Sequence, residues 1–252
     1  MKWTSFLALL LTVFFCCPIA TLAGPLAQRL ESYPHLLAKP SFPRKEADLI
    51  YPDWMAGTWL VESLLLHQFA PFSPDFVTPG FKKNAVYLHR PVSFLVKFIP
   101  KKVFNSTLIP VLNPHRAIIA DRGFNGLSIA QAYLGNKGII SVKVANDNPD
   151  RQHSFFPDNL RLVSTVIGRG SEQVDSDSFI TCEISEQRFQ SPGSLYINEV
   201  ETITAYRLVS QGTIEADQLT AIYLSPQDPQ YFRSLNRPVA VYKYRLNLQA
   251  KS

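Results

Sequence analysis

The chain has 252 residues, 46% of them hydrophobic, and a formal net charge of +5 at pH 7. The basic excess is modest and dispersed, whereas nucleic-acid binding needs a dense basic face and a recognisable module, so composition argues against a nucleic-acid partner. The length suffices for a hydrophobic core, and neither composition nor charge indicates an oligomeric state.

Residues 1–23 have the build of a secretory signal peptide. Lys2 is the single basic residue before the apolar run, and Ala23 ends a small-residue cleavage site in front of Gly24. The apolar run is roughly 15 residues, shorter than the ~20 that span a bilayer, which favours cleavage over a retained anchor. We therefore expect an exported protein that lacks residues 1–23.

Cleavage would also remove two of the three cysteines, Cys16 and Cys17. An exported chain with one cysteine holds no internal disulfide, so the core alone must hold the fold. Cys182 lies in a strand-like run, where a free cysteine is usually a small buried hydrophobe rather than a reactive thiol.

Residues 24–52 form a Pro-rich leader, which we expect to wrap as extended chain on the domain that follows, residues 53–250. After Gly57 the sequence alternates with period two, placing Trp59, Val61, Ser63 and Leu65 on one strand face. Further strand-like runs lie at 84–89, 92–98, 106–112, 116–121, 138–146, 160–168, 178–189, 194–208, 213–224 and 239–248.

One helix interrupts this series. Asn125 can cap its N-terminus and Gly135 can end it, which predicts a helix from Asn125 to Leu134. Many strands with hairpin-length links and one short helix indicate a mainly β protein, a single antiparallel β-barrel or barrel-like sandwich. In a closed barrel the first and last strands must be neighbours.

Two sequence features resemble known families. Gly57-Thr58-Trp59 at the first strand and Arg245 in the last strand resemble the barrel ends of lipocalins and the wider calycin group. This resemblance implies that Trp59 closes one barrel end and that Arg245 packs across its ring, with Gly57 leaving room for close approach of the chain.

The segments YPDWMAGTW, DRGFNG, NPDRQ, NEVET and LSPQDPQYF together resemble an uncharacterised family of exported proteins in cyanobacteria and plastids. The resemblance implies a location in the periplasm or thylakoid lumen. It offers no activity, catalytic residue or cofactor.

The residues themselves indicate little catalytic chemistry. The five histidines are widely spaced and no metal-ligand or nucleophile motif is present, so we predict no metal, no cofactor and no catalytic residue. Glu199 and Glu201 lie two apart on one strand and point the same way. If that face is interior, the two carboxylates could serve acid–base chemistry, because their separation lies in the range that glycosidases use. If the face is exterior, they are solvated charges, and the flanking isoleucines lie under a loop or helix.

Other side chains are candidates for ligand binding. Arg122 stands where a strand ends and a helix begins, which suits an anion site or, alternatively, a structural pair with a glutamate. Inward tyrosines could line an apolar pocket with hydroxyl groups, or could simply fill a barrel core. The ligand-binding candidates are Arg122, Tyr196, Glu199, Glu201, Tyr206, Tyr242 and Tyr244.

Three functions remain open. The leading hypothesis is a non-enzymatic barrel that binds a small apolar ligand such as a lipid, pigment or tetrapyrrole. The second is an interaction or assembly factor for a membrane complex, acting through exposed loops such as 225–238. The lysine doublets at 82–83 and 101–102 could contact an anionic membrane surface, or could be solvated loop charges. The third is a hydrolase using Glu199 and Glu201. An open apolar cavity would support the first hypothesis. An exposed aromatic loop on a filled core would support the second, and a cleft that holds both glutamates would support the third.

Overall fold

The computed structural model describes residues 24–36, 38–42, 48–101 and 116–251. The expected signal peptide and the strand-like run at 106–112 lie outside these residues. None of the helices in the described ranges combines the length and the apolar character needed to cross a membrane.

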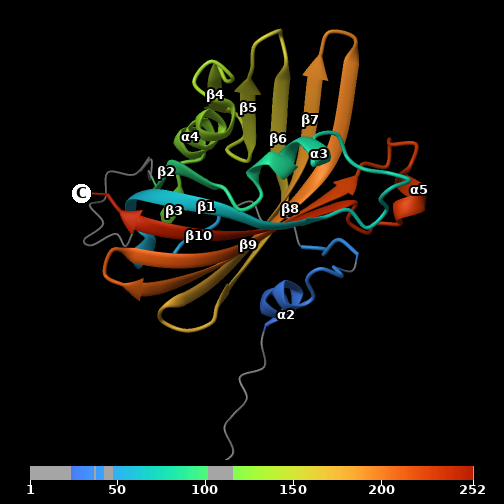
Figure 1. Ribbon diagram of the computed structural model, residues 1–252. Coiled ribbons are helices and arrows are strands. Elements are labelled where there is room, and N and C mark those ends of the chain that lie inside the picture. The colour runs from blue at the N-terminus through green and yellow to red at the C-terminus, as the bar shows by residue number, and fades with distance from the viewer. Residues whose placement is uncertain (1–23, 37, 43–47, 102–115, 252) are drawn as a thin grey trace, which may run out of the picture.

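The described strands form one ten-stranded antiparallel sheet in the order β3-β2-β1-β10-β9-β8-β7-β6-β5-β4 (Figure 1). The strands are β1 (Gly57–Phe69), β2 (Pro91–Pro100), β3 (Ile118–Ala120), β4 (Ser141–Val144), β5 (Arg151–Phe155), β6 (Arg161–Gln173), β7 (Ser178–Ser191), β8 (Ser194–Ser210), β9 (Thr213–Leu224) and β10 (Ala240–Ala250). The predicted mainly β, antiparallel fold is confirmed.

The sheet curls into a half-barrel (Figure 1). β1 lies between β2 and β10, so the first and last strands are neighbours, as the closure argument predicted. The sheet does not close on itself, however, because its two edges are β3 and β4. β3 is only three residues long, and the chain then leaves the sheet to form a helix.

The gap between the two edges of the sheet is called the seam below. The helix α4 (Arg122–Leu134) covers it by packing against β2 on one side and against β4 and β5 on the other. Asn125 bonds both backbone groups of Lys97, accepting from its N–H at 2.7 Å and donating to its carbonyl at 3.1 Å. Ser128 accepts from the Leu95 N–H at 3.0 Å. Two helix side chains therefore bond the part of the β2 edge that the short strand β3 does not reach.

The helix starts earlier than predicted. Asp121, not Asn125, is its N-cap, since the Asp121 carboxylate accepts from the Phe124 N–H at 3.1 Å. Two further predictions were wrong: residues 85–87 of the expected strand at 84–89 form a 3₁₀ helix, and the expected link at 147–154 contains most of β5. Short polar runs such as Arg-Gln-His-Ser carry no apolar alternation, so strand pairing alone reveals them.

The leader packs on the domain, as predicted, and lies on the convex side of the sheet (Figure 1). It is not extended throughout, because residues 25–31 form the helix α2 (Pro25–Glu31) outside the half-barrel. The buried cluster beneath it comprises Leu26, Ile180, Cys182 and Ile203. A larger cluster fills one end of the concave side: Met55, Trp59, Val61, Val96, Phe98, Ile118, Phe179, Ile214, Ala216, Leu246 and Leu248. The sheet thus buries an apolar cluster on each of its two faces.

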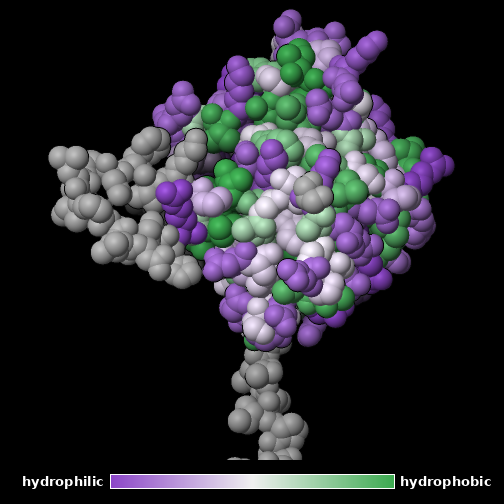
Figure 2. All heavy atoms as spheres, turned by 90° about the vertical axis from the view of Figure 1, so that its left-hand side faces the viewer, coloured by the Kyte–Doolittle hydropathy of each residue, from purple (hydrophilic) through white to green (hydrophobic). Residues whose placement is uncertain are grey.

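The remaining helices are one-turn pieces in the loops, α3 (Phe81–Asn84) and α5 (Tyr231–Ser234). On the face that Figure 2 shows, hydrophobic residues lie in small groups among hydrophilic ones, the usual appearance of a solvated protein surface.

Candidate functional site

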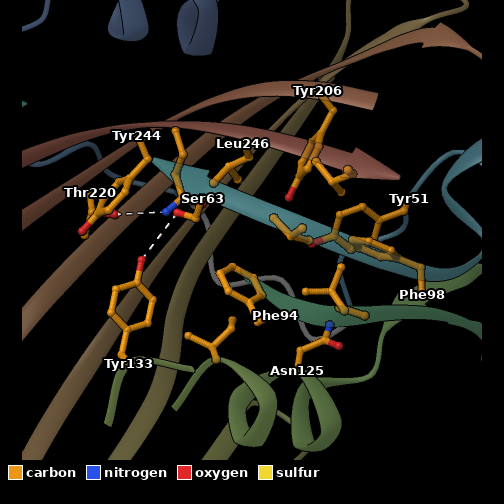
Figure 3. Close-up of a pocket in the computed structure, with 16 residues that line it drawn as sticks. Tyr51, Ser63, Phe94, Phe98, Asn125, Tyr133, Tyr206, Thr220, Tyr244 and Leu246 are labelled. Atoms are coloured by element: carbon orange, nitrogen blue, oxygen red, sulfur yellow. Dashed lines mark hydrogen bonds between the residues drawn. The ribbon is translucent and has the colours of Figure 1, made fainter. Parts of the chain in front are cut away.

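The concave side of the half-barrel holds a cavity of about 330 Å³. Strands β1, β2, β8, β9 and β10 supply its floor and walls, and α4 supplies its cover (Figure 3). No residue that lines it carries a charge: the lining is Tyr51, Val61, Ser63, Phe94, Val96, Phe98, Ala120, Asn125, Ile129, Tyr133, Tyr206, Gln218, Thr220, Tyr244, Leu246 and Leu248.

Strand alternation positions these side chains. Alternate residues of a strand face the same side, and the antiparallel register sets Gln218 opposite Tyr244 and Ser63 opposite Leu246. On α4 the residues that reach the cavity are Asn125, Ile129 and Tyr133, whose spacing of four keeps them on one helix face. Closing the seam and covering the cavity are therefore tasks of the same helix.

The cavity has two chemically different ends. Ser63, Tyr133, Thr220 and Tyr244 lie together at one end, and the rings of Tyr51, Phe98 and Tyr206 lie toward the other (Figure 3). Tyr51 packs against Phe98 with the ring centroids 4.7 Å apart. Polar groups are thus concentrated at the first end, although Asn125 and the hydroxyls of Tyr51 and Tyr206 also line the cavity.

Hydrogen bonds at the polar end are long. The Ser63 Oγ and Tyr133 hydroxyl oxygen are 3.5 Å apart, and Gln218 Nε2 donates to Thr220 Oγ1 at 3.5 Å (Figure 3). The Thr204 hydroxyl donates to the side-chain amide oxygen Oε1 of Gln218 at 3.3 Å. Strong bonds of this kind are shorter, near 2.7–3.0 Å, so these groups retain capacity for another partner.

Burial keeps the cavity tyrosines protonated. Burial raises the pKa of Tyr206 to about 12, and it also raises the pKa of Tyr51, Tyr133 and Tyr244 above the ordinary value. Their hydroxyl groups therefore act as neutral hydrogen-bond donors throughout the physiological pH range.

Arg122, the anion-site candidate, is engaged in an ion pair instead of facing the cavity. Its guanidinium lies 2.5 Å from the Glu183 carboxylate, and Glu183 is also 3.4 Å from Arg169. Arg169, almost fully buried, pairs in turn with Asp150. This network of two cations and two anions fastens the start of α4 to strands β6 and β7.

Glu199 and Glu201 point away from the cavity, to the convex side under the leader. Glu201 is 1% exposed and accepts from the Arg29 guanidinium at 2.7 Å and from the Tyr223 hydroxyl at 2.6 Å. Glu199 forms an ion pair with Lys39. Both glutamates therefore lie on the exterior face of the strand, one of the two alternatives above. Cations of the leader, and not solvent, neutralise their charges. Neither carboxylate lines the cavity.

Two of the predicted tyrosines, Tyr206 and Tyr244, border the cavity. Tyr242 is buried beside Tyr244, with the ring centroids 6.5 Å apart, and does not line it. Tyr196 lies farther along β8, where its ring packs 6.0 Å from that of Phe189.

The expected stacking of Arg245 on Trp59 is absent. The register pairs Trp59 with Ala250 and Arg245 with Leu64, and an odd separation of five residues puts the two side chains on opposite faces. Arg245 is instead an exposed partner of Asp217 at 3.5 Å. Trp59 is buried, as predicted, and its indole N–H donates to the Met55 carbonyl at 2.8 Å.

Gly57 is required for its backbone conformation and not, as expected, to leave room for another part of the chain. Its φ is +125°, which disfavours any side chain, while the position of an added Cβ is open space. The glycine therefore sets the backbone entry into β1.

Sequence reasoning missed the polar lining residues Ser63, Gln218 and Thr220. Their signal was a polar residue at an inward position of a strand whose other inward residues are apolar. No group of three or more His, Cys, Asp or Glu side chains among the described residues is arranged to hold a metal ion.

A second hollow of about 480 Å³ lies along β7–β10, but the exposed ion pairs Arg207–Glu215 and Arg245–Asp217 form part of its lining. Such a surface lacks the apolar enclosure typical of ligand sites, so the concave cavity is the better candidate.

Comparison with protein families matches residues 44–252 to the family described as domain of unknown function (DUF6816). Comparisons with curated proteins and with solved structures give no match. Because the family match covers well over half of the sequence, the chain belongs to the DUF6816 family.

Proposed function

We propose that the protein is a non-enzymatic carrier or receptor that binds one small apolar molecule in the concave cavity. One observation carries the proposal: a cavity of about 330 Å³, lined by apolar and aromatic side chains with a few convergent hydroxyl and amide groups. Ligand pockets have this size and this mixture. Further parts of the proposal are a lipocalin-like mode of binding and export to a periplasm or thylakoid lumen, which the apolar stretch in residues 1–23 supports.

The energetics favour an apolar occupant. Each buried methylene contributes roughly 0.8 kcal/mol, and a void lined by side chains loses the packing contacts that an occupant would restore. The polar groups are too few to hold a hydrophilic molecule, and the largest group of them lies at one end, where it would orient the ligand: Ser63, Tyr133, Thr220 and Tyr244.

Titration with N-phenyl-1-naphthylamine, a neutral dye that fluoresces in apolar sites, tests the proposal. We expect saturable one-to-one binding to the wild-type protein. Gln218→Phe adds bulk inside the cavity and should weaken binding at least about tenfold, which corresponds to roughly 1.4 kcal/mol. Asp217→Phe adds the same bulk at the adjacent, outward position and should bind as the wild type does. The same affinity for all three proteins, or no saturable binding, would refute the proposal.

Contact with a membrane surface is a second candidate function, favoured by the loop that carries α5. Phe232 is 78% exposed and Leu235 68% exposed, and Arg233 stands between them. Aromatic and aliphatic tips beside basic residues suit an anionic lipid surface. Phe232→Ser should reduce flotation with anionic vesicles, whereas Leu195→Ser, at another exposed leucine, should not.

A further inference from the structure

We infer that the ligand is uncharged and that it places a carbonyl or hydroxyl oxygen at the polar end of the cavity, against Tyr133 and Tyr244. The inference rests on the proposed function, because it names the class of molecule that this same cavity accepts. Three features of the site carry it: the absence of charge in the lining, the supply of hydrogen-bond donors, and the slack in the existing hydrogen bonds.

No cation or anion lines the cavity to neutralise a charged ligand. The charged groups of the neighbouring network, Arg122, Arg169, Glu183 and Asp150, are paired with one another. An ionised carboxylate or ammonium group moved into this space would lose its hydration without gaining a counter-ion, and such a transfer is strongly unfavourable. The lining therefore discriminates against fatty acids and amines of otherwise suitable shape.

Two tyrosine hydroxyls at the polar end have weak hydrogen bonding or none to other described residues. Within the described part of the chain, the Tyr244 hydroxyl makes no hydrogen bond to another residue. The Tyr133 hydroxyl has only the 3.5 Å contact with Ser63. A neutral tyrosine hydroxyl can donate as well as accept, and one ligand oxygen with two lone pairs can accept from both hydroxyls at once.

The slack in the network makes room for this oxygen. Contacts of 3.5 Å at Ser63–Tyr133 and at Gln218–Thr220 can shorten or exchange when a ligand oxygen enters between them. Because Tyr133 belongs to α4, a bound oxygen would also link the covering helix to the sheet.

Competition at about pH 8 tests the inference with four probes of graded chemistry. N-phenyl-1-naphthylamine reports occupancy, and decan-1-ol, methyl decanoate and decanoate compete for the site. We expect the alcohol and the ester to displace the dye at concentrations at least about tenfold below those that decanoate needs. Equal displacement by decanoate, or displacement by none of the three, would overturn the inference while dye binding still supports the proposed function. Failure of the dye itself to bind refutes the proposed function instead.

Tyrosine variants locate the oxygen. Tyr133→Phe and Tyr244→Phe should each raise the decan-1-ol concentration needed for displacement by about fivefold or more, because each removes one donor. Affinity for the dye, which contains no oxygen, should stay within about twofold, and this shows that the variants are folded. Tyr231→Phe, whose hydroxyl bonds Asn236 in the α5 loop, is the matched control and should leave both values unchanged. Unchanged alcohol affinity in both cavity variants contradicts the placement.

Discussion

Glu201 lies beneath the leader at the centre of a small buried polar cluster. Arg29 and Tyr223 bond its carboxylate, and the Cys182 sulfur is 3.9 Å from it. Burial, together with the charge of Glu201, raises the pKa of the Cys182 thiol and of the Tyr223 hydroxyl, so both stay protonated. The cluster is therefore one paired charge surrounded by neutral groups, an arrangement that holds a leader in place and leaves no reactive thiolate.

Arg29→Met should destabilise the fold by about 3–5 kcal/mol, because it leaves the Glu201 carboxylate buried without its counter-ion. Arg207→Met is the matched control: it removes an arginine–glutamate pair whose side chains are 61% and 49% exposed, and it should cost less than about 1 kcal/mol. Urea unfolding of both variants gives the two values. Similar losses from the two substitutions would show that the leader contact contributes no more than a surface ion pair.

Tyr206 makes stability depend on alkaline pH. Its pKa rises from 10.0 in an exposed tyrosine to about 12 in the fold because burial disfavours the phenolate. A raised pKa means that the folded state holds the proton more tightly, so the stabilisation is complete below pH 10 and is lost between about 10 and 12. The wild type should lose about 2–3 kcal/mol more than Tyr206→Phe between about pH 9 and about pH 12, measured by urea unfolding. Parallel losses in both proteins would contradict this shift.

Among the elements, the long strands could be predicted from the sequence and the seam could not. Period-two alternation predicted β9 with the bounds that it has in the structure, and it placed Trp59, Val61, Ser63 and Leu65 on one buried face of β1. Alternation reports which side of a strand is buried, but it does not say which strand lies beside which.

The errors arose where a side chain serves a partner distant in sequence. Asn125 suits an N-cap by residue type, yet its amide bonds the edge of β2. Gly170 in β6 also serves a distant partner, since an added Cβ there would lie 2.8 Å from the Phe42 ring of the leader. Trp59 and Arg245 were matched by family pattern, and the register of two paired strands separates them.

Asn125→Ala should loosen the seam. It removes two hydrogen bonds to the edge of β2 and should destabilise the protein by about 1–3 kcal/mol. The Lys97 amide should exchange with solvent faster, because its acceptor is lost. Asn136→Ala, at an exposed position just beyond the helix, should leave exchange unchanged. Protection of Lys97 that survives Asn125→Ala would show that the helix packs there without these bonds.

At the scale of the whole molecule, stability and the candidate site lie in different parts of the sheet. Strands β6–β10 pair along their length, and the leader buries their outer face. No residue of α4 is fully buried, and the sheet edges beside it, β3 and β4, are three and four residues long. Local opening starts where buried apolar contacts are few, so the cover of the cavity is the segment expected to open first.

Native-state hydrogen exchange should therefore separate two levels of protection. Amides of α4 should exchange through a local opening whose free energy lies about 2 kcal/mol or more below that of β7–β9, which open only with global unfolding. A ligand that contacts Asn125, Ile129 and Tyr133 can stabilise only the closed helix, so saturating N-phenyl-1-naphthylamine should slow exchange in α4 more than in the α2 leader on the opposite face. Uniform protection without the dye would show that the seam unfolds with the whole sheet. Equal slowing of α2 and α4 would show that the dye stabilises the fold without closing this helix over the cavity.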